Sequence, residues 1–197
     1  MKKKWLTLLV ISAIGSCKAP TGNMPADYKT QAEVGSNDLD IRDYSRIIKD
    51  NPGHAEAYVY RGMAYVRKGD YDRAIQDFTK AIEIEPRAGS TYGKRGAAHL
   101  ESRHYEEAIR DLTKAIELYP RFAQAYFNRG SAHFNKGNYE QALRDFTAAI
   151  EIYPGYGKAY HGRARTYRAK RLDKVATEDF RRACDLGVED ACRAPKR

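Results

Sequence analysis

The charged side chains best placed to do chemistry in this sequence are arginines and aspartates that recur in a fixed register. An arginine returns every 34 residues and an aspartate follows it after sixteen, which gives the pairs Arg61 and Asp77, Arg95 and Asp111, Arg129 and Asp145, and Arg163 and Asp179. Arginine is rarely buried unless it is paired. We therefore predict a row of structural ion pairs, formed either within one repeat or between neighbouring repeats. A row of ligand-binding arginines is the alternative.

Histidine and cysteine offer little metal or catalytic chemistry here. His99 and His133 share a column that holds tyrosine in other copies, so we expect each imidazole to replace a core phenol rather than to bind a metal. Cys184 and Cys192 lack the further ligands that a zinc site needs. The sequence contains no glycine-rich phosphate loop and no nucleophile paired with a base at a recognisable spacing. We therefore predict a protein that is not an enzyme, with no catalytic residue, metal site or cofactor.

The paired charges belong to a longer repeat of 34 residues. Segments that begin at residues 55, 89, 123 and 157 share several columns, which are Tyr58, Tyr92, Tyr126 and Tyr160; Gly62, Gly96 and Gly130 with Ala164; Ala74, Ala108, Ala142 and Ala176; and Pro86, Pro120 and Pro154. This pattern resembles the tetratricopeptide repeat (TPR). The resemblance implies an all-α, right-handed superhelical solenoid of helix hairpins that binds proteins.

The residue types in these columns suit a stack of helix hairpins. Small residues at the glycine and alanine columns allow two antiparallel helices to approach closely, and the proline column ends the second helix. One hairpin cannot bury its own apolar face, so the copies must stack. We expect first helices near 55–68, 89–102, 123–136 and 157–170, and second helices near 71–85, 105–119, 139–153 and 173–186. The turns between them carry Gly69 and Gly137 in two copies but Arg103 and Arg171 in the others, which predicts that those turns differ locally.

The repeats divide the chain into eight segments. We predict a signal peptide at 1–16, a flexible tether at 17–36, a half-repeat capping helix at 37–54, repeats at 55–88, 89–122, 123–156 and 157–187, and a C-terminal cap at 188–197. In the half repeat, Ile41, Asp43 and Tyr44 fall in the columns of a second helix, and Pro52 falls in the proline column. A capping helix of this kind covers the apolar end of a solenoid.

The first residues resemble a bacterial lipoprotein signal peptide. Lys2, Lys3 and Lys4 precede an apolar run at 5–14, and Gly15 and Ser16 stand before Cys17. The run is too short to span a bilayer. The resemblance implies lipidation of Cys17 and a lipid anchor in the cell envelope; an ordinary secretory signal with an incidental cysteine is the alternative. No aspartate follows Cys17, which favours the outer membrane, facing the periplasm.

The two C-terminal cysteines are similar in spacing to the C-x7-C hairpins of cysteine-rich bacterial helical repeats. Seven residues separate Cys184 from Cys192. In those relatives the cysteines bridge adjacent helices, and an exported protein meets an oxidising space. The resemblance therefore implies a disulfide that pins a short last helix, near 188–193, against the helix before it. Two free buried thiols are the alternative.

The TPR resemblance also implies a concave groove lined by the first helices. The stripe expected to face it is mainly apolar in the first three repeats and basic in the fourth. It holds Glu56, Val59, Met63 and Val66; Ser90, Gly93, Ala97 and Leu100; Gln124, Phe127, Ser131 and Phe134; and Lys158, His161, Arg165 and Arg168. Exposed apolar patches mark interaction sites, although another segment of the chain could cover this one. Gly93 and Phe127 stand where the clamp for chaperone C-termini needs polar residues, so we do not expect that mode of docking.

The charge of the chain is concentrated at its C-terminal end. The formal net charge is +9, and residues 157–197 hold 12 Lys and Arg against 6 Asp and Glu. The predicted export argues against a nucleic-acid partner. We predict a lipid-anchored scaffold for a protein or peptide partner of the envelope. The alternative is a binder of an acidic envelope ligand, such as peptidoglycan or an anionic lipid or glycan, through the basic end.

Overall fold

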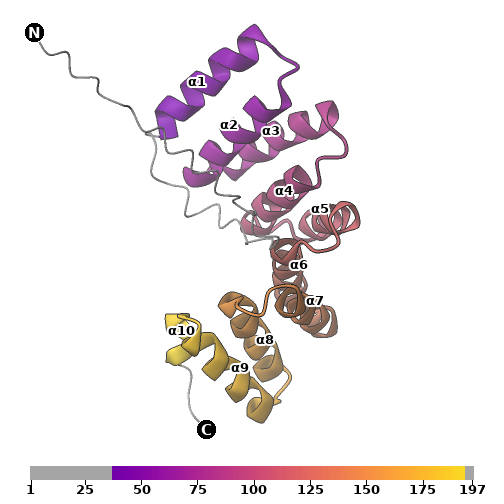
Figure 1. Cartoon of the computed structure of the whole chain (residues 1–197), viewed down its shortest axis with the longest axis vertical. Coiled ribbons are helices and arrows are strands. Elements are labelled where there is room, and N and C mark those ends of the chain that lie inside the picture. Colours follow the sequence, from indigo (N-terminus) through magenta and orange to yellow (C-terminus); the bar gives the residue numbers. More distant parts are fainter. Residues whose placement is uncertain (1–36, 194–197) are drawn as a thin grey trace, which may run out of the picture.

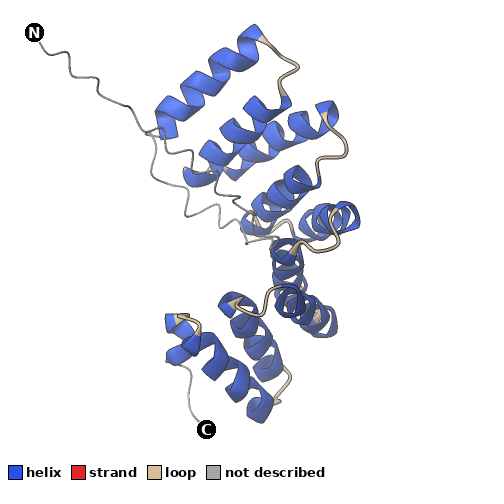
Figure 2. Ribbon diagram, viewed as in Figure 1, coloured by secondary structure: helices blue, strands red, loops and turns tan. Residues whose placement is uncertain are grey.

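The computed structural model describes residues 37–193, and every regular element in that range is a helix (Figures 1 and 2). The helices are α1 (Asn37–Asp50), α2 (Ala55–Arg67), α3 (Tyr71–Ile84), α4 (Gly89–Glu101), α5 (Tyr105–Leu118), α6 (Ala123–Asn135), α7 (Tyr139–Ile152), α8 (Gly157–Ala169), α9 (Asp173–Asp185) and α10 (Glu189–Cys192). The predicted all-α architecture is confirmed. The predicted signal peptide, Cys17 and tether lie outside the described residues, as do residues 194–197. Between residues 37 and 193 no helix is both long and apolar enough to cross a bilayer.

The helices form a curved stack of hairpins in chain order (Figure 1). Each first helix packs on its own second helix and on the second helix of the preceding repeat. The first helices α4, α6 and α8 also contact one another in sequence, whereas successive second helices make at most marginal contacts within the described residues. The first helices therefore lie on the inner, concave side of the curve.

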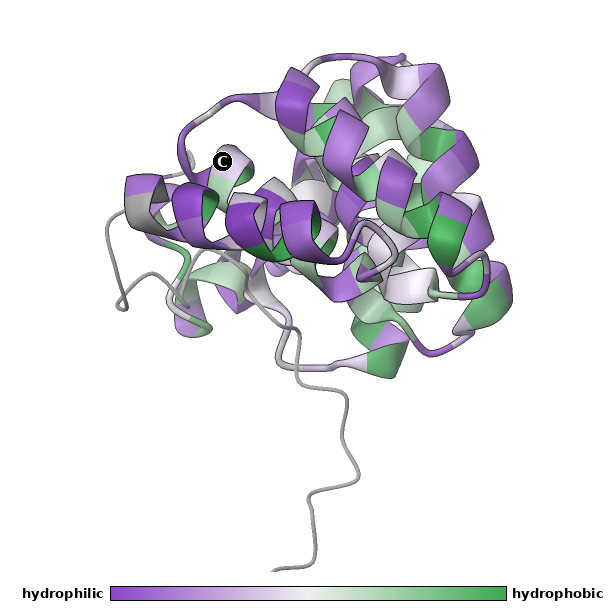
Figure 3. Cartoon of the chain, turned by 90° about the horizontal axis from the view of Figure 1, so that it is seen from above, coloured by the Kyte–Doolittle hydropathy of each residue, from purple (hydrophilic) through white to green (hydrophobic). Residues whose placement is uncertain are grey.

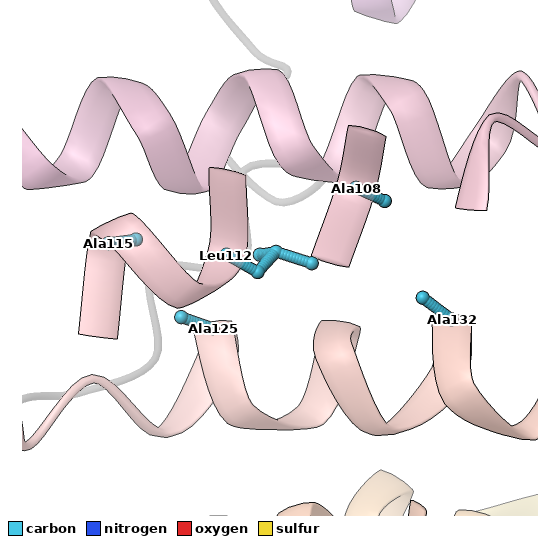
Figure 4. Packing of buried hydrophobic residues seen from close by; sticks show 5 residues of the cluster. All are labelled: Ala108, Leu112, Ala115, Ala125 and Ala132. Atoms are coloured by element: carbon cyan, nitrogen blue, oxygen red, sulfur yellow. The ribbon is translucent and has the colours of Figure 1, made fainter. Parts of the chain in front are cut away.

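The hairpins close tightly because glycine faces a bulky side chain across each of the first three. A β-carbon at Gly62 would lie 2.8 Å from Phe78 Cε1, and one at Gly96 would lie 2.7 Å from Leu112 Cγ. Alanine fills most of the remaining core, and Figure 4 shows Ala108, Leu112 and Ala115 of α5 facing two alanines of α6. Figure 3 shows hydrophobic residues gathered where helices meet and hydrophilic residues over much of the outer surface.

The turns inside the hairpins adopt one conformation in all four copies. Gly69 and Gly137 have φ of 77° and 80°, and Arg103 and Arg171 have φ of 61° and 62°. The prediction that the arginine turns differ is wrong. In each copy the backbone N–H of this residue donates to the carbonyl three residues earlier, as from Arg103 to Leu100 at 3.1 Å. The hairpin geometry therefore imposes a left-handed residue even where the sequence provides arginine.

Helices α1 and α10 cover the two ends of the described stack. On α1, the Tyr44 ring stacks on Tyr60 of α2 with ring centroids 5.3 Å apart, and the Asp40 carboxylate pairs with Arg67. At the other end, Cys184 of α9 and Cys192 of α10 form a disulfide with an S–S distance of 2.08 Å. Cys184 occupies the column of Ile82, Ile116 and Ile150. The disulfide thus connects a core position of α9 to the short final helix, which spans Glu189–Cys192 rather than 188–193.

Candidate functional site: a cavity on the concave face

The structure brings each arginine of the repeating row together with the aspartate of its own repeat. In the first repeat, Arg61 Nε and Nη2 donate to the two Asp77 oxygens at 2.8 and 2.7 Å. The pairs Arg95–Asp111, Arg129–Asp145 and Arg163–Asp179 have the same bidentate geometry. Hydrogen bonding to the carboxylate raises the pKa of Arg61, Arg95 and Arg163. These arginines are occupied within the hairpin and do not form a ligand-binding row.

Each of these arginines also contacts the preceding repeat through a hydroxyl that sequence reasoning missed. The Nη1 atoms donate to Ser45, Thr79, Thr113 and Thr147 at 3.0 to 3.1 Å. The hydroxyls of Ser45 and Thr79 in turn donate to backbone carbonyls four residues earlier. These hydroxyl residues recur every 34 residues, so the column can be seen in the sequence. Each guanidinium therefore links its own hairpin to the preceding one.

One of the two core histidines, His99, lies next to this row. His99 Nε2 lies 3.8 Å from Asp111 Oδ2, and the Nδ1 atoms of His99 and His133 are buried without a hydrogen-bond partner. Burial lowers the pKa of both imidazoles, because the charged form loses its hydration. Across residues 37–193 no group of three or more His, Cys, Asp or Glu side chains is placed to hold a metal ion.

The predicted apolar groove residues are mostly packed between helices. Val59, Met63 and Val66 pack against the core that contains Ala74, Phe78 and Ala98. Leu100 packs against the cluster around Leu112, the Phe127 ring contacts Phe146, and the Phe134 ring lies 5.8 Å from Tyr139. The prediction that Gly93 and Ala97 face solvent is wrong, since both are buried.

The basic residues of α8 are partly engaged with aromatic rings. The Arg165 guanidinium lies over the Phe134 ring at 4.9 Å, and Arg168 lies over Phe180 at the same distance. His161 also contacts Phe180, and its burial lowers the pKa of the imidazole. Lys158 is exposed at the start of α8. Two of the arginines on the fourth repeat are therefore already stacked on aromatic rings of the protein.

One column at the junctions between repeats decides where the concave face is filled. This column holds the N-cap residues of α4, α6 and α8, which are Ala88, Phe122 and Tyr156. Phe122 covers α4 so closely that a β-carbon on Gly93 would lie 2.8 Å from its ring. Tyr156 lies 5.1 Å from the Phe127 ring, and its hydroxyl donates to Gln124 Oε1 at 2.9 Å. Ala88 has no ring to fill the corresponding space between α2 and α4.

A cavity of about 390 Å³ opens at this junction, and we call it the α2/α4 cavity. Its apolar wall includes Val59, Met63, Ala88, Gly93 and Phe122, and its polar groups include Tyr60, Lys94, Gln124 and Asn128. Glu56 and Glu85 are exposed residues of the lining. Sequence reasoning placed Val59, Met63 and Gln124 on this face but missed Tyr60, Lys94 and Asn128. The signal that could have found the cavity is the small residue at position 88 where later repeats have aromatic rings.

The polar groups of the α2/α4 cavity differ in whether they have hydrogen-bond or ion-pair partners. Asn128 is buried, and its Oδ1 accepts a hydrogen bond of 3.2 Å from Gln124 Nε2. Lys94 is partly buried, and within the described residues its ammonium group has neither an ion pair nor a hydrogen bond. Loss of hydration lowers the pKa of Lys94, and no carboxylate in the described part of the chain opposes the effect. The arrangement combines apolar walls with a cation that has no partner among the described residues, which suits a group that is both apolar and anionic.

Comparison with known proteins places the repeats in a known family. Family models described as tetratricopeptide repeat match residues 55–87 and 94–157. A crystal structure of MamA superposes with a TM-score of 0.72 at 26% identity, covering 79% of this chain and 91% of that one. YrrB, described as a TPR protein with an unusual peptide-binding site, superposes with a TM-score of 0.71 at 26% identity, covering 86% of this chain and 89% of that one.

A further MamA structure shows the same fold at lower identity. It comes from Desulfovibrio magneticus RS-1 and superposes with a TM-score of 0.73 at 22% identity, covering 82% of this chain and 89% of that one. The comparison with curated protein sequences found no match.

Proposed function

Because this chain is a tetratricopeptide-repeat protein, we propose that it is a scaffold without enzymatic activity that binds an extended segment of a partner protein on its concave face. The observation that carries the proposal is the α2/α4 cavity of about 390 Å³, which is lined by the first helices of three successive repeats. Cavities with apolar walls and a few polar groups are the usual sites for a bound side chain. YrrB, a similar structure, is described as having a peptide-binding site.

The proposal places the scaffold in the bacterial cell envelope, held by lipid on Cys17 and facing the periplasm from the outer membrane. Its support is the basic and apolar start of the sequence before Cys17. A lipid anchor with two or more acyl chains gives stable membrane attachment. Cys17→Ser should therefore move the protein from the detergent phase to the aqueous phase in Triton X-114 partitioning. Retention of the variant in the detergent phase would contradict the anchor.

A matched pair of tyrosines allows the binding face to be tested. Tyr60 lines the α2/α4 cavity, Tyr119 does not, and each is 47% exposed. A photo-crosslinking phenylalanine analogue at position 60 should capture a partner in intact cells, whereas the same analogue at position 119 should not. Adding Ala88→Phe should abolish the adduct at position 60, because the new ring fills the cavity. We expect Ala88→Phe to fold normally, since Phe122 occupies the equivalent N-cap with similar backbone angles.

The crosslinking pattern also separates this function from the alternative. Equal capture at positions 60 and 119, or an adduct that persists with Ala88→Phe, would contradict binding in the cavity. Charge reversal of Arg165 and Arg168 tests the second candidate, an acidic envelope ligand at the basic end. That candidate rests on the charge excess of residues 157–197. Binding through exposed cations weakens strongly with salt, so the basic end would give a salt-sensitive complex and the apolar cavity a salt-resistant one.

A further inference from the structure

Lys94 is the feature of the α2/α4 cavity that the general scaffold function leaves unexplained. Its ammonium group lines the cavity, is partly buried, and has no partner among the described residues. Other cations in this part of the chain do have partners: Lys80 pairs with Glu83 at 2.7 Å, and Lys114 pairs with Glu117 at 2.9 Å. A desolvated charge without a partner is costly, and an anion that enters the cavity would offset that cost.

The shape of the cavity indicates how such an anion is delivered. The lining extends from Glu56 and Tyr60 on α2, across Lys94 on α4, to Gln124 and Asn128 on α6. Lys94 therefore lies in the middle of the lined surface, with groups available for contact on both sides. A chain that ended in a carboxylate at Lys94 would leave one side uncovered, whereas an internal acidic side chain allows the peptide to continue across all three helices.

The surroundings of Lys94 limit which acidic segments fit. Val59, Met63 and Phe122 offer an apolar wall beside the ammonium group, and the exposed carboxylates of Glu56 and Glu85 lie on the same lining. Glu56 and Glu85 would repel a second carboxylate brought close to them. A run of acidic residues would place carboxylates near Glu56 and Glu85, whereas a single acidic residue with apolar neighbours would not.

We propose that the α2/α4 cavity binds an extended, internal peptide segment through one Asp or Glu side chain, which pairs with Lys94 while an adjacent apolar side chain packs on Val59, Met63 and Phe122. This inference rests on the proposed function and specifies the ligand of the same site. Asn128 and Gln124 form the polar border toward α6, where they can contact the peptide backbone. Lys94 is the residue that selects the acidic side chain, and Ala88 is the residue that leaves room for its apolar neighbour.

The test uses the full chain in mild detergent and two bead-bound libraries of random octapeptides. One library has acetylated N-termini and amidated C-termini, and the other has free C-terminal carboxylates. The proteins are wild type, Lys94→Met, Ala88→Phe and the control Lys80→Met, which removes an exposed lysine outside the cavity lining. Wild type and Lys80→Met should enrich amidated peptides with one Asp or Glu next to an apolar residue. Lys94→Met should lose the acidic preference and keep the apolar one, and Ala88→Phe should lose both.

The affinity of one selected peptide measures how much its acidic residue contributes to binding. Replacing its acidic residue by the amide should weaken binding to wild type about tenfold, since a hydrogen bond to a charged group contributes at least about 1.4 kcal/mol. The same replacement should change binding to Lys94→Met less than about twofold, as expected when the paired charge is already absent.

Several results would overturn the inference. It fails if wild type shows no acidic preference, if Lys94→Met keeps that preference, or if only the library with free C-termini is enriched, which would assign Lys94 to a terminal carboxylate. Its failure differs from failure of the scaffold function. If Ala88→Phe abolishes the crosslink at position 60 but Lys94→Met leaves peptide selection unchanged, the cavity still binds a partner and only the acidic specificity is wrong.

Discussion

The junction between α2 and α4 and the junction between α6 and α8 are built from the same repeat columns, yet one is open and the other is filled. At the filled junction Tyr156 contacts the Phe127 ring and donates its hydroxyl to Gln124. At the open junction the equivalent N-cap is Ala88. The hairpins next to the two junctions contain arginine–aspartate pairs with the same bidentate geometry. The difference shows that a single column can open a cavity without altering the stack that carries it.

Removing one of these arginine–aspartate pairs should have the largest effect on stability. Arg129→Ala leaves Asp145 buried without its bidentate partner and removes the hydrogen bond to Thr113. Loss of one member of a buried pair typically costs 3–5 kcal/mol, so we expect about 4 kcal/mol less free energy of unfolding. Urea denaturation followed by circular dichroism measures this change. Arg110→Ala is the control, because the Arg110 side chain is 72% exposed and pairs with Glu107 on the surface; it should cost less than about 1 kcal/mol.

If Arg129→Ala and Arg110→Ala destabilised equally, the row would not hold the stack together. The similarity of the two junctions would then need another cause, such as packing of the alanine columns.

The second prediction converts the filled junction into an open one. Tyr156→Ala should create a cavity between α6 and α8 like the one next to Ala88, and should cost about 3 kcal/mol as expected for loss of a buried aromatic side chain. Thermal denaturation measures the cost, and Tyr119→Ala, which removes a tyrosine that is 47% exposed, is the control. A loss no greater than in the control would mean that the ring at this column does not fill the junction.

The regular columns explain why the fold could be predicted from sequence and the cavity could not. Gly62 and Phe78, or Arg61 and Asp77, report a structure that every repeat shares, so their recurrence is visible without coordinates. The α2/α4 cavity arises where the repeat pattern is broken, at Ala88, and Lys94 is distinctive because no carboxylate among residues 37–193 interacts with it. An absence of contact leaves no periodic signal in the sequence.

The groove residues illustrate the same limit. The period of a single helix predicts that Gly93 faces solvent. In the structure, Phe122 of the following repeat covers Gly93. Contacts between repeats therefore decide which part of a helical stripe remains accessible, and the helical period alone cannot show this.

The third prediction concerns the end of the stack, where no further full repeat follows α8 and α9 within the described residues. There Val188 takes over part of the packing, since a β-carbon on Gly157 would lie 2.9 Å from its Cγ2 atom. The disulfide Cys184–Cys192 holds this segment in place. Replacing both cysteines by serine should cost about 2.5 kcal/mol, the loop-closure entropy expected for a short loop.

Hydrogen exchange measured by mass spectrometry should locate this loss. Faster exchange should appear in α10 and the end of α9, with no change near Ala88. Uniform acceleration across the chain would mean that the disulfide stabilises the whole stack rather than its end, and the two junctions would then not be independent of the cap.

The smallest change in stability is expected from substitutions in the turns inside the hairpins, rather than at the junctions between repeats. Arg103 and Arg171 hold left-handed backbone angles that Gly69 and Gly137 adopt in the other two copies. A residue with a β-carbon pays roughly 1–2 kcal/mol in this conformation, whereas glycine loses more backbone entropy on folding, by about 0.5–1 kcal/mol. Arg103→Gly should therefore stabilise the protein by about 0.5–1 kcal/mol in urea denaturation, and Gly69→Arg should destabilise it by a similar amount. Opposite signs in these two variants would show that the shared turn conformation sets the preference at both positions. If Arg103→Gly proved destabilising, the arginine side chain must make a compensating contribution in its turn, and the repeats would differ in their turns as well as in the filling of their junctions.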